Sequence, residues 1–136
     1  GCGSGILSIG AMLLGAKDAF AVDIEQNAAE SAAENAVRNG IDLANYQTFC
    51  GNILDDEALV ARLGDGYDVV CANIVADILI AMRKLFVRFM KSDARLMLSG
   101  IIDERLDEVL TAMQQEGLTV LNVEHSAGWA AVLMKK

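Results

Sequence analysis

The chain has 136 residues, an apolar fraction of 54% and a formal net charge of -8. This length is enough for one domain with a substantial core, and the acidic balance argues against general nucleic-acid binding, which needs a basic surface. No run approaches the roughly 18 consecutive apolar residues of a membrane span, and no basic leader precedes an apolar run. We therefore expect a single cytoplasmic domain that binds neither membrane nor nucleic acid directly.

The cysteine pattern indicates free thiols. Cys2, Cys50 and Cys71 are odd in number, far apart and not arranged as CxxC pairs. This pattern is typical of a reducing compartment and predicts neither a disulfide nor a metal site.

The first half of the chain alternates helical and extended patterns. It predicts, in chain order, a helix over 6–13, a strand over 19–22, a helix over 25–39, a strand within 45–52 and a helix over 56–63. Gly15 and Gly40 end the first two helices, because glycine tolerates the left-handed conformation of a helix C-terminus.

The second half continues the alternation and then changes. It predicts, in chain order, a strand over 67–72, a helix over 76–90, a strand over 94–99 closed by Gly100, a helix over 104–116, and strands over 118–124 and 129–134. Only the residues HSAG separate the last two strands, so these strands form an antiparallel pair. The alternation up to Gly117 predicts an α/β fold with a mostly parallel sheet and helices on both faces, and ligands bind such sheets at the carboxyl ends of strands.

The opening residues GCGSG place glycines at alternate positions before the first helix. A P-loop would need a lysine and a Ser or Thr after the last glycine, but Ile6 and Leu7 follow. A dinucleotide fingerprint would need a third glycine where Ile6 stands. An adenosyl-sulfonium pocket needs only close backbone approach, and Asp23, 20 residues after Gly3, lies where an acidic residue accepts ribose hydroxyls in either cofactor class. The alternative is a tight turn, with Asp23 capping the next helix.

Three stretches together resemble the PrmA family of ribosomal-protein methyltransferases: GCGSGILSIGAMLLGAKDAFAVDIE, VVCANIVADIL and LMLSGIIDERLDEVL. The resemblance covers essentially the whole chain. It implies a Rossmann-like class I methyltransferase fold, a three-layer sandwich that ends in a reversed strand, with S-adenosylmethionine as cofactor. It also implies a protein of the large ribosomal subunit, protein eleven, as substrate, methylated on lysine and N-terminal amines.

The resemblance also implies roles for individual residues. Gly1 and Asp23 match cofactor contacts, Gly3 and Gly5 shape the same loop, and Ile24 is expected to join the cofactor contacts.

Two asparagines follow predicted strands. Asn73 matches the asparagine beside the transferred methyl group, where its carbonyl oxygen can orient an amine; an Asx turn is the alternative. Asn52 is placed to meet the adenine edge, and a turn asparagine is equally compatible with the pattern.

Three further residues have weaker signals. Asp77, at the start of a predicted helix, is expected to cap it rather than to attract a cationic amine. We expect His125 to be structural and Trp129 to pack at the core or an edge, with substrate contact as the alternative for Trp129.

The start of the chain and the absence of proline predict a catalytic core that is truncated at its N-terminus. The resemblance implies a strand before Gly1, an upstream loop and a separate substrate-recognition domain. The rival functions are a methyltransferase for another protein or a small molecule, and a cofactor-binding fragment without activity.

Overall fold

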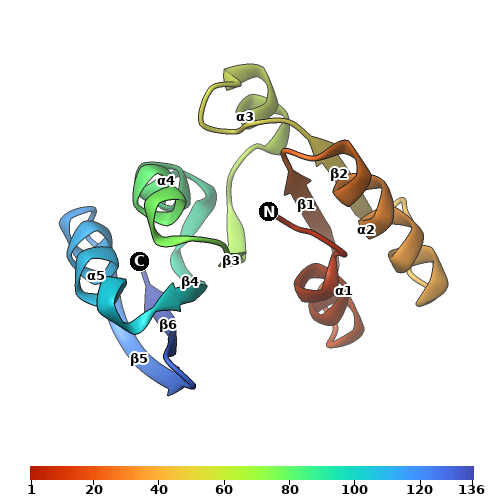
Figure 1. Ribbon diagram of the computed structural model, residues 1–136. Coiled ribbons are helices and arrows are strands. Elements are labelled where there is room, and N and C mark those ends of the chain that lie inside the picture. The colour runs from red at the N-terminus through yellow and green to blue at the C-terminus, as the bar shows by residue number, and fades with distance from the viewer. The chain divides into compact units, whose positions relative to one another are not determined.

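The computed structural model describes all 136 residues, which divide into two compact units, 1–63 and 64–136. The elements of the first unit are α1 (Ile6–Leu13), β1 (Ala19–Asp23), α2 (Gln26–Arg38), β2 (Tyr46–Cys50) and α3 (Glu57–Leu63) (Figure 1). The elements of the second unit are β3 (Tyr67–Asn73), α4 (Ala76–Phe89), β4 (Met90–Ile102), the 3-10 turn Asp103–Arg105, α5 (Leu106–Gln115), β5 (Thr119–Ser126) and β6 (Trp129–Lys135).

The first unit is built on a parallel pair, in which β1 and β2 run in register from Ala19↔Tyr46 to Asp23↔Cys50. Helix α2 packs on these strands through small side chains. Ala32 and Ala36, on the side of the helix that faces the strands, are completely buried. Alanine combines high helix propensity with a small volume, so one alanine-rich stretch both forms the helix and lets it lie close to the strands. Ile9, Ala21, Ala36 and Tyr46 form a core in this unit.

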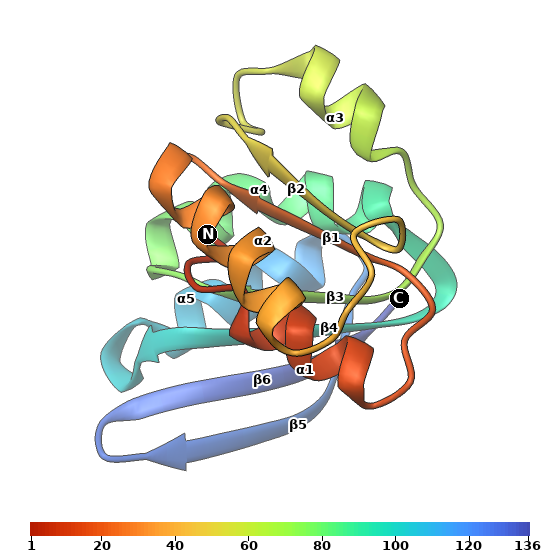
Figure 2. The same ribbon diagram turned by 90° about the vertical axis from the view of Figure 1, so that its right-hand side faces the viewer.

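The second unit contains a four-stranded sheet in the order β3-β4-β6-β5. Strand β3 is parallel to β4, and β6 is antiparallel to both β4 and β5, as the short link between the last two strands predicted. Helices α4 and α5 cover one face of this sheet, where Leu79, Phe86, Val109 and Met113 pack with the strand residues Leu96, Leu98, Val132 and Met134. Figure 2 shows β5 and β6 side by side, joined by a tight turn.

Three boundaries differ from those predicted. Strand β4 is longer than 94–99, because Met90 already pairs with Tyr67 and, beyond Gly100, Ile101 pairs with Ala130. The helix expected over 104–116 begins as the 3-10 turn and becomes α-helical at Leu106. The hairpin link shortens from HSAG to Ala127 and Gly128, both with positive φ (51° and 84°), the backbone of a two-residue turn that matches the twist of paired strands. No helix has the length and apolar character needed to cross a membrane.

Candidate functional site

The glycine loop before α1 is held by hydrogen bonds at both ends. The N–H of Cys2 donates to the carbonyl of Val22 at 2.9 Å, and the N–H of Gly5 closes a turn onto the carbonyl of Cys2 at 2.9 Å. The side-chain amide of Asn35 donates to the carbonyl of Ser4 at 3.0 Å, which ties the loop to α2. The backbone of the loop is therefore held in a defined position beside the C-terminal end of β1.

Gly3 and Gly5 have different surroundings, although both have positive φ (52° and 82°). A Cβ on Gly3 would meet no atom within 4 Å, so this part of the loop borders open space. A Cβ on Gly5 would lie 2.6 Å from the Tyr46 hydroxyl and 3.0 Å from the Cβ of Ala32. Gly5 thus packs inward against α2 and β2, whereas Gly3 presents its backbone outward.

A partly buried hydroxyl pair supports the inward side of the loop. The Ser8 hydroxyl donates to the Gly5 carbonyl at 3.0 Å and lies 2.8 Å from the hydroxyl of Tyr46. Because Ser8 has one hydroxyl hydrogen and uses it on Gly5, Tyr46 is the donor to Ser8. Burial raises the pKa of Tyr46, which keeps the phenol protonated for this role. The sequence gives no local signal for this pair, because its members are separated by 38 residues.

Asp23 lies at the end of β1 and is buried, with 8% of the residue exposed. Its Oδ2 accepts the N–H of Gly3 at 2.9 Å and its Oδ1 accepts the N–H of Glu25 at 3.0 Å. Burial raises the pKa of this carboxyl, but the hydrogen bonds from the N–H groups of Gly3 and Glu25 act against it, and the pKa lies below its ordinary value. The acidic residue predicted from its spacing thus contacts the glycine loop directly, and the structure joins the two parts of the motif.

The lowered pKa of Asp23 predicts a pH-dependent contribution to stability. A carboxyl with a depressed folded-state pKa stabilises the fold above its unfolded pKa, near 3.9, and this contribution is lost as the pH falls through the folded value. Asp23→Asn places an N–H₂ group beside an N–H donor and should lower the free energy of unfolding at pH 7 by about 1 to 3 kcal/mol.

Urea unfolding at pH 7 and at pH 2 measures this effect. The difference between wild type and Asp23→Asn should shrink at pH 2, whereas the exposed Asp18→Asn should match wild type at both values. A difference that is the same at both pH values would contradict the assigned hydrogen bonds.

Ile24 and Asn52 follow the two strands of the first unit. The side chain of Ile24 is 66% exposed directly after Asp23, and its carbonyl accepts a weak bond from the Cys50 thiol at 3.5 Å. The Asn52 oxygen accepts the N–H of Leu54 at 3.1 Å, and its amide donates to Asp55 at 2.6 Å. Asn52 therefore organises the turn after β2. A turn asparagine was one of the two roles compatible with the sequence, beside contact with the adenine edge.

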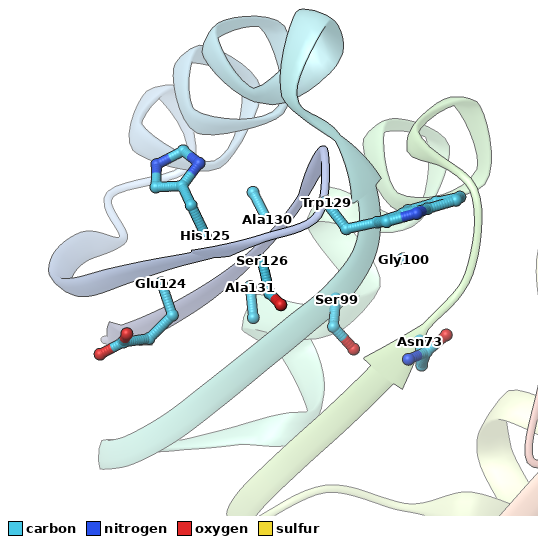
Figure 3. Close-up of a pocket in the computed structure, with 9 residues that line it drawn as sticks. All are labelled: Asn73, Ser99, Gly100, Glu124, His125, Ser126, Trp129, Ala130 and Ala131. Atoms are coloured by element: carbon cyan, nitrogen blue, oxygen red, sulfur yellow. The ribbon is translucent and has the colours of Figure 1, made fainter.

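Asn73 ends β3 in the second unit and is exposed beside Gly100 of β4 (Figure 3). Gly100 has φ 76°, and a Cβ there would lie 3.1 Å from Asn73 Oδ1 and 3.2 Å from the carbonyl oxygen of Ile74. Because Gly100 has no side chain, β4 can lie close to the Asn73 side chain and to the backbone of Ile74. The sequence marked Gly100 only as the end of a strand.

A cavity of about 410 Å³ lies at this end of the four-stranded sheet. Asn73, Ser99 and Gly100 line one part of it, and Glu124 and Trp129 line another. Trp129 is 52% exposed, so packing does not account for its whole surface, and Figure 3 shows its ring extending toward Gly100.

Two of the remaining polar residues contact acidic or basic side chains that are distant in the sequence. The prediction that Asp77 caps α4 is wrong: Val75 occupies the N-cap without a side-chain hydrogen bond, and Asp77, inside the first turn, pairs with Arg105 at 2.6 Å. His125 Nδ1 lies 2.8 Å from Asp103 Oδ1 and joins the hairpin to the start of the 3-10 turn.

Parallel pairs alternating with helices, followed by an antiparallel hairpin, define the class I methyltransferase fold. A solved putative methyltransferase complexed with SAH matches 98% of this chain and 43% of its own, with a TM-score of 0.80 and 12% identity, a likeness that shows the fold alone. A ribosomal protein L11 methylase from Lactobacillus delbrueckii subsp. bulgaricus matches 100% of this chain and 67% of its own, with a TM-score of 0.89 and 28% identity.

The family follows from the sequence comparisons. A family model described as Ribosomal protein L11 methyltransferase (PrmA) matches residues 1–136, and the chain belongs to this family. A ribosomal protein L11 methyltransferase of Lachnospira eligens is 39% identical over 138 residues, which cover 100% of this chain and 43% of that protein. The chain spans less than half the length of the curated relatives that it matches.

Proposed function

We propose that this chain carries the cofactor-binding and catalytic parts of an S-adenosylmethionine-dependent methyltransferase that acts on amines of ribosomal protein L11, on lysine side chains and the N-terminus. Family membership supports the reaction and the substrate. The observation that carries the proposal is the 2.9 Å hydrogen bond from the Gly3 N–H to Asp23, which unites the glycine loop with the acidic residue of the motif.

The residues of the first unit fit an adenosyl cofactor. Asp23 offers about four acceptor positions, so its carboxylate retains capacity for ribose hydroxyls after binding the loop. The open space at Gly3 and the neighbouring Gly1 admit close approach of a ligand to the backbone, while Gly5 shapes the loop from inside. Ile24 presents an exposed apolar side chain suited to the adenine ring, and Asn52 retains one amide N–H for the adenine edge.

The second unit supplies the groups that orient the nucleophile. When bound, S-adenosylmethionine supplies a methyl group activated by a positively charged sulfur. Asn73 Oδ1 and the neighbouring Ile74 carbonyl, both close to Gly100, accept the N–H bonds of a neutral amine and thereby direct its lone pair. Neutralising a lysine of ordinary pKa costs about 4.6 kcal/mol at pH 7, a cost that a desolvated site lowers.

The proposal also covers the domain organisation, the protein partner and the cellular location. Residues 1–136 work as one methyltransferase domain, whose protein partner is L11 and whose location is the cytoplasm. The names of the relatives support the partner, and the three free cysteines support a reducing compartment. The net charge of -8 supports a protein substrate rather than direct nucleic-acid binding.

Calorimetric titration with S-adenosylhomocysteine tests the cofactor part of the proposal. The wild-type chain should bind one equivalent, and Asp23→Ala should bind more weakly by about 1.5 to 3 kcal/mol, because the charge-assisted bonds to the ribose are lost. This loss corresponds to roughly 10- to 150-fold in the dissociation constant.

Asp18→Ala, which removes an exposed carboxylate from the same unit, is the matched control and should bind as wild type does. Circular dichroism establishes that each variant is folded. Unchanged affinity in Asp23→Ala would contradict the role of Asp23, and no saturable binding by the folded wild-type chain would contradict the proposed cofactor.

A further inference from the structure

A row of side chains crosses all four strands of the second unit on the face away from α4 and α5. Asn73 pairs with Ser99 across β3 and β4, and Glu124 pairs with Ala131 across β5 and β6. Between β4 and β6 the register shifts at a bulge, where Ser99 and Gly100 together oppose Ala131. The bulge therefore aligns Asn73 at one edge of the sheet with Glu124 at the other.

The direction of these side chains follows from strand alternation. The neighbours Ala72, Leu98, Val123 and Ala130 pack in the core beneath α4 and α5, so the residues of the row face the opposite side. Figure 3 shows this division: Ser99, Glu124 and Ala131 project from one side of the sheet, and His125 and Ala130 from the other.

Glu124 places a fixed negative charge at the far end of the row. The Asn122 amide donates to its Oε1 at 2.7 Å, which positions the carboxylate and leaves Oε2 available for a ligand. No lysine or arginine lines the same cavity, and the histidine that does, His125, contacts Asp103 and points to the other face of the sheet, away from Glu124. The cavity thus combines a neutral amide, Asn73, with one free carboxylate oxygen, an arrangement that favours a basic ligand.

The distance across the row sets the spacing of the ligand groups. Asn73 and Glu124 stand three interstrand steps apart, about 14 Å at about 4.8 Å a step. An extended polypeptide advances about 3.4 Å a residue and directs every second side chain to the same side, so residues i and i+4 span about 14 Å on one side.

We propose that Glu124 is a specificity residue that binds a second basic side chain of the substrate polypeptide, four residues from the amine held at Asn73. This inference rests on the proposed function for its placement of the acceptor amine. It adds a substrate class, an extended segment with basic residues at positions i and i+4. Because Glu124 is exposed, its pair with a lysine should favour the dibasic segment by about fivefold, and added salt should reduce this preference.

The test is a binding titration that needs neither methyl donor nor turnover. Trp129, the single tryptophan of the chain, lines the cavity, so its fluorescence reports on occupancy. The probes are two blocked five-residue peptides, one with lysine at positions 1 and 5 and alanine between, the other with glutamine replacing the second lysine. Wild type should bind the dibasic peptide about fivefold more tightly, and Glu124→Gln should bind the two peptides equally.

Asp93→Asn is the matched control, because it removes one exposed negative charge from the opposite end of β4 and should keep the preference. Equal binding of the two peptides by wild type, a preference that survives Glu124→Gln, or no fluorescence change with either peptide would each overturn the inference. Failure of the proposed function would appear separately, as absence of S-adenosylhomocysteine binding or methyl transfer, and would leave this readout unchanged.

Discussion

Replacing Asn73 by alanine is expected to lower the rate constant of methyl transfer to an amine by about 100- to 1,000-fold, the range found when a positioned polar group at a reacting centre is removed. S-adenosylhomocysteine affinity should fall far less. The physical reason is that Asn73 Oδ1 and the neighbouring Ile74 carbonyl are two acceptors that together can hold a neutral amine in a single orientation. Without the side chain, the remaining carbonyl leaves the lone pair free to rotate away.

This prediction is checked by single-turnover methylation of L11 under saturating donor, together with calorimetry of S-adenosylhomocysteine. Ser99→Ala is the matched control, because Ser99 pairs with Asn73 on the neighbouring strand and lines the same cavity but supplies neither of these two acceptors. Ser99→Ala should retain most of the rate. Equal losses of rate and affinity in Asn73→Ala would remove the proposed amine-orienting role and assign Asn73 to cofactor binding alone.

The second large effect is expected at Gly5. Gly5→Ala should lower the free energy of unfolding by about 2 to 5 kcal/mol, because it combines a left-handed backbone with overpacking against buried groups. The new Cβ would stand 2.6 Å from the Tyr46 hydroxyl and 3.2 Å from the Ala32 backbone, and Tyr46 is only 1% exposed. Neither neighbour is a flexible side-chain end, so neither can move aside cheaply.

Gly3→Ala is the control within the same loop. Its φ is also positive, but its Cβ would meet open space, so only the backbone cost of about 1 to 2 kcal/mol applies. Urea unfolding of the two variants measures the difference. The double variant Gly5→Ala/Tyr46→Phe should recover part of the loss by removing the hydroxyl that the new Cβ approaches. Equal stability of Gly3→Ala and Gly5→Ala would contradict the inward packing of Gly5.

Sequence periodicity predicted the helices and strands of this protein within a few residues, because these elements depend on local propensity and on the spacing of apolar residues. The antiparallel hairpin was predictable because four residues cannot contain a helical crossover. The length of β4 was not, since its ends are formed by pairing with Tyr67 and Ala130, residues distant in the chain. The capping role expected of Asp77 failed for the same reason: Arg105, 28 residues away, provides its partner.

The sequence by itself determined three things: the glycine loop, its 20-residue spacing to Asp23, and the family. Each depends on short stretches of neighbouring residues or on their spacing, so no tertiary contact is needed to recognise it. Only the tertiary structure decided that Gly5 packs inward while Gly3 borders open space, since the two glycines are indistinguishable until α2 and Tyr46 lie beside them. It also decided that Glu124 shares a row with Asn73. That alignment depends on the register of four strands and on one bulge at Gly100. Register is set by pairing between distant segments, and a shift of one residue would turn the side chains of a strand to the opposite face of the sheet.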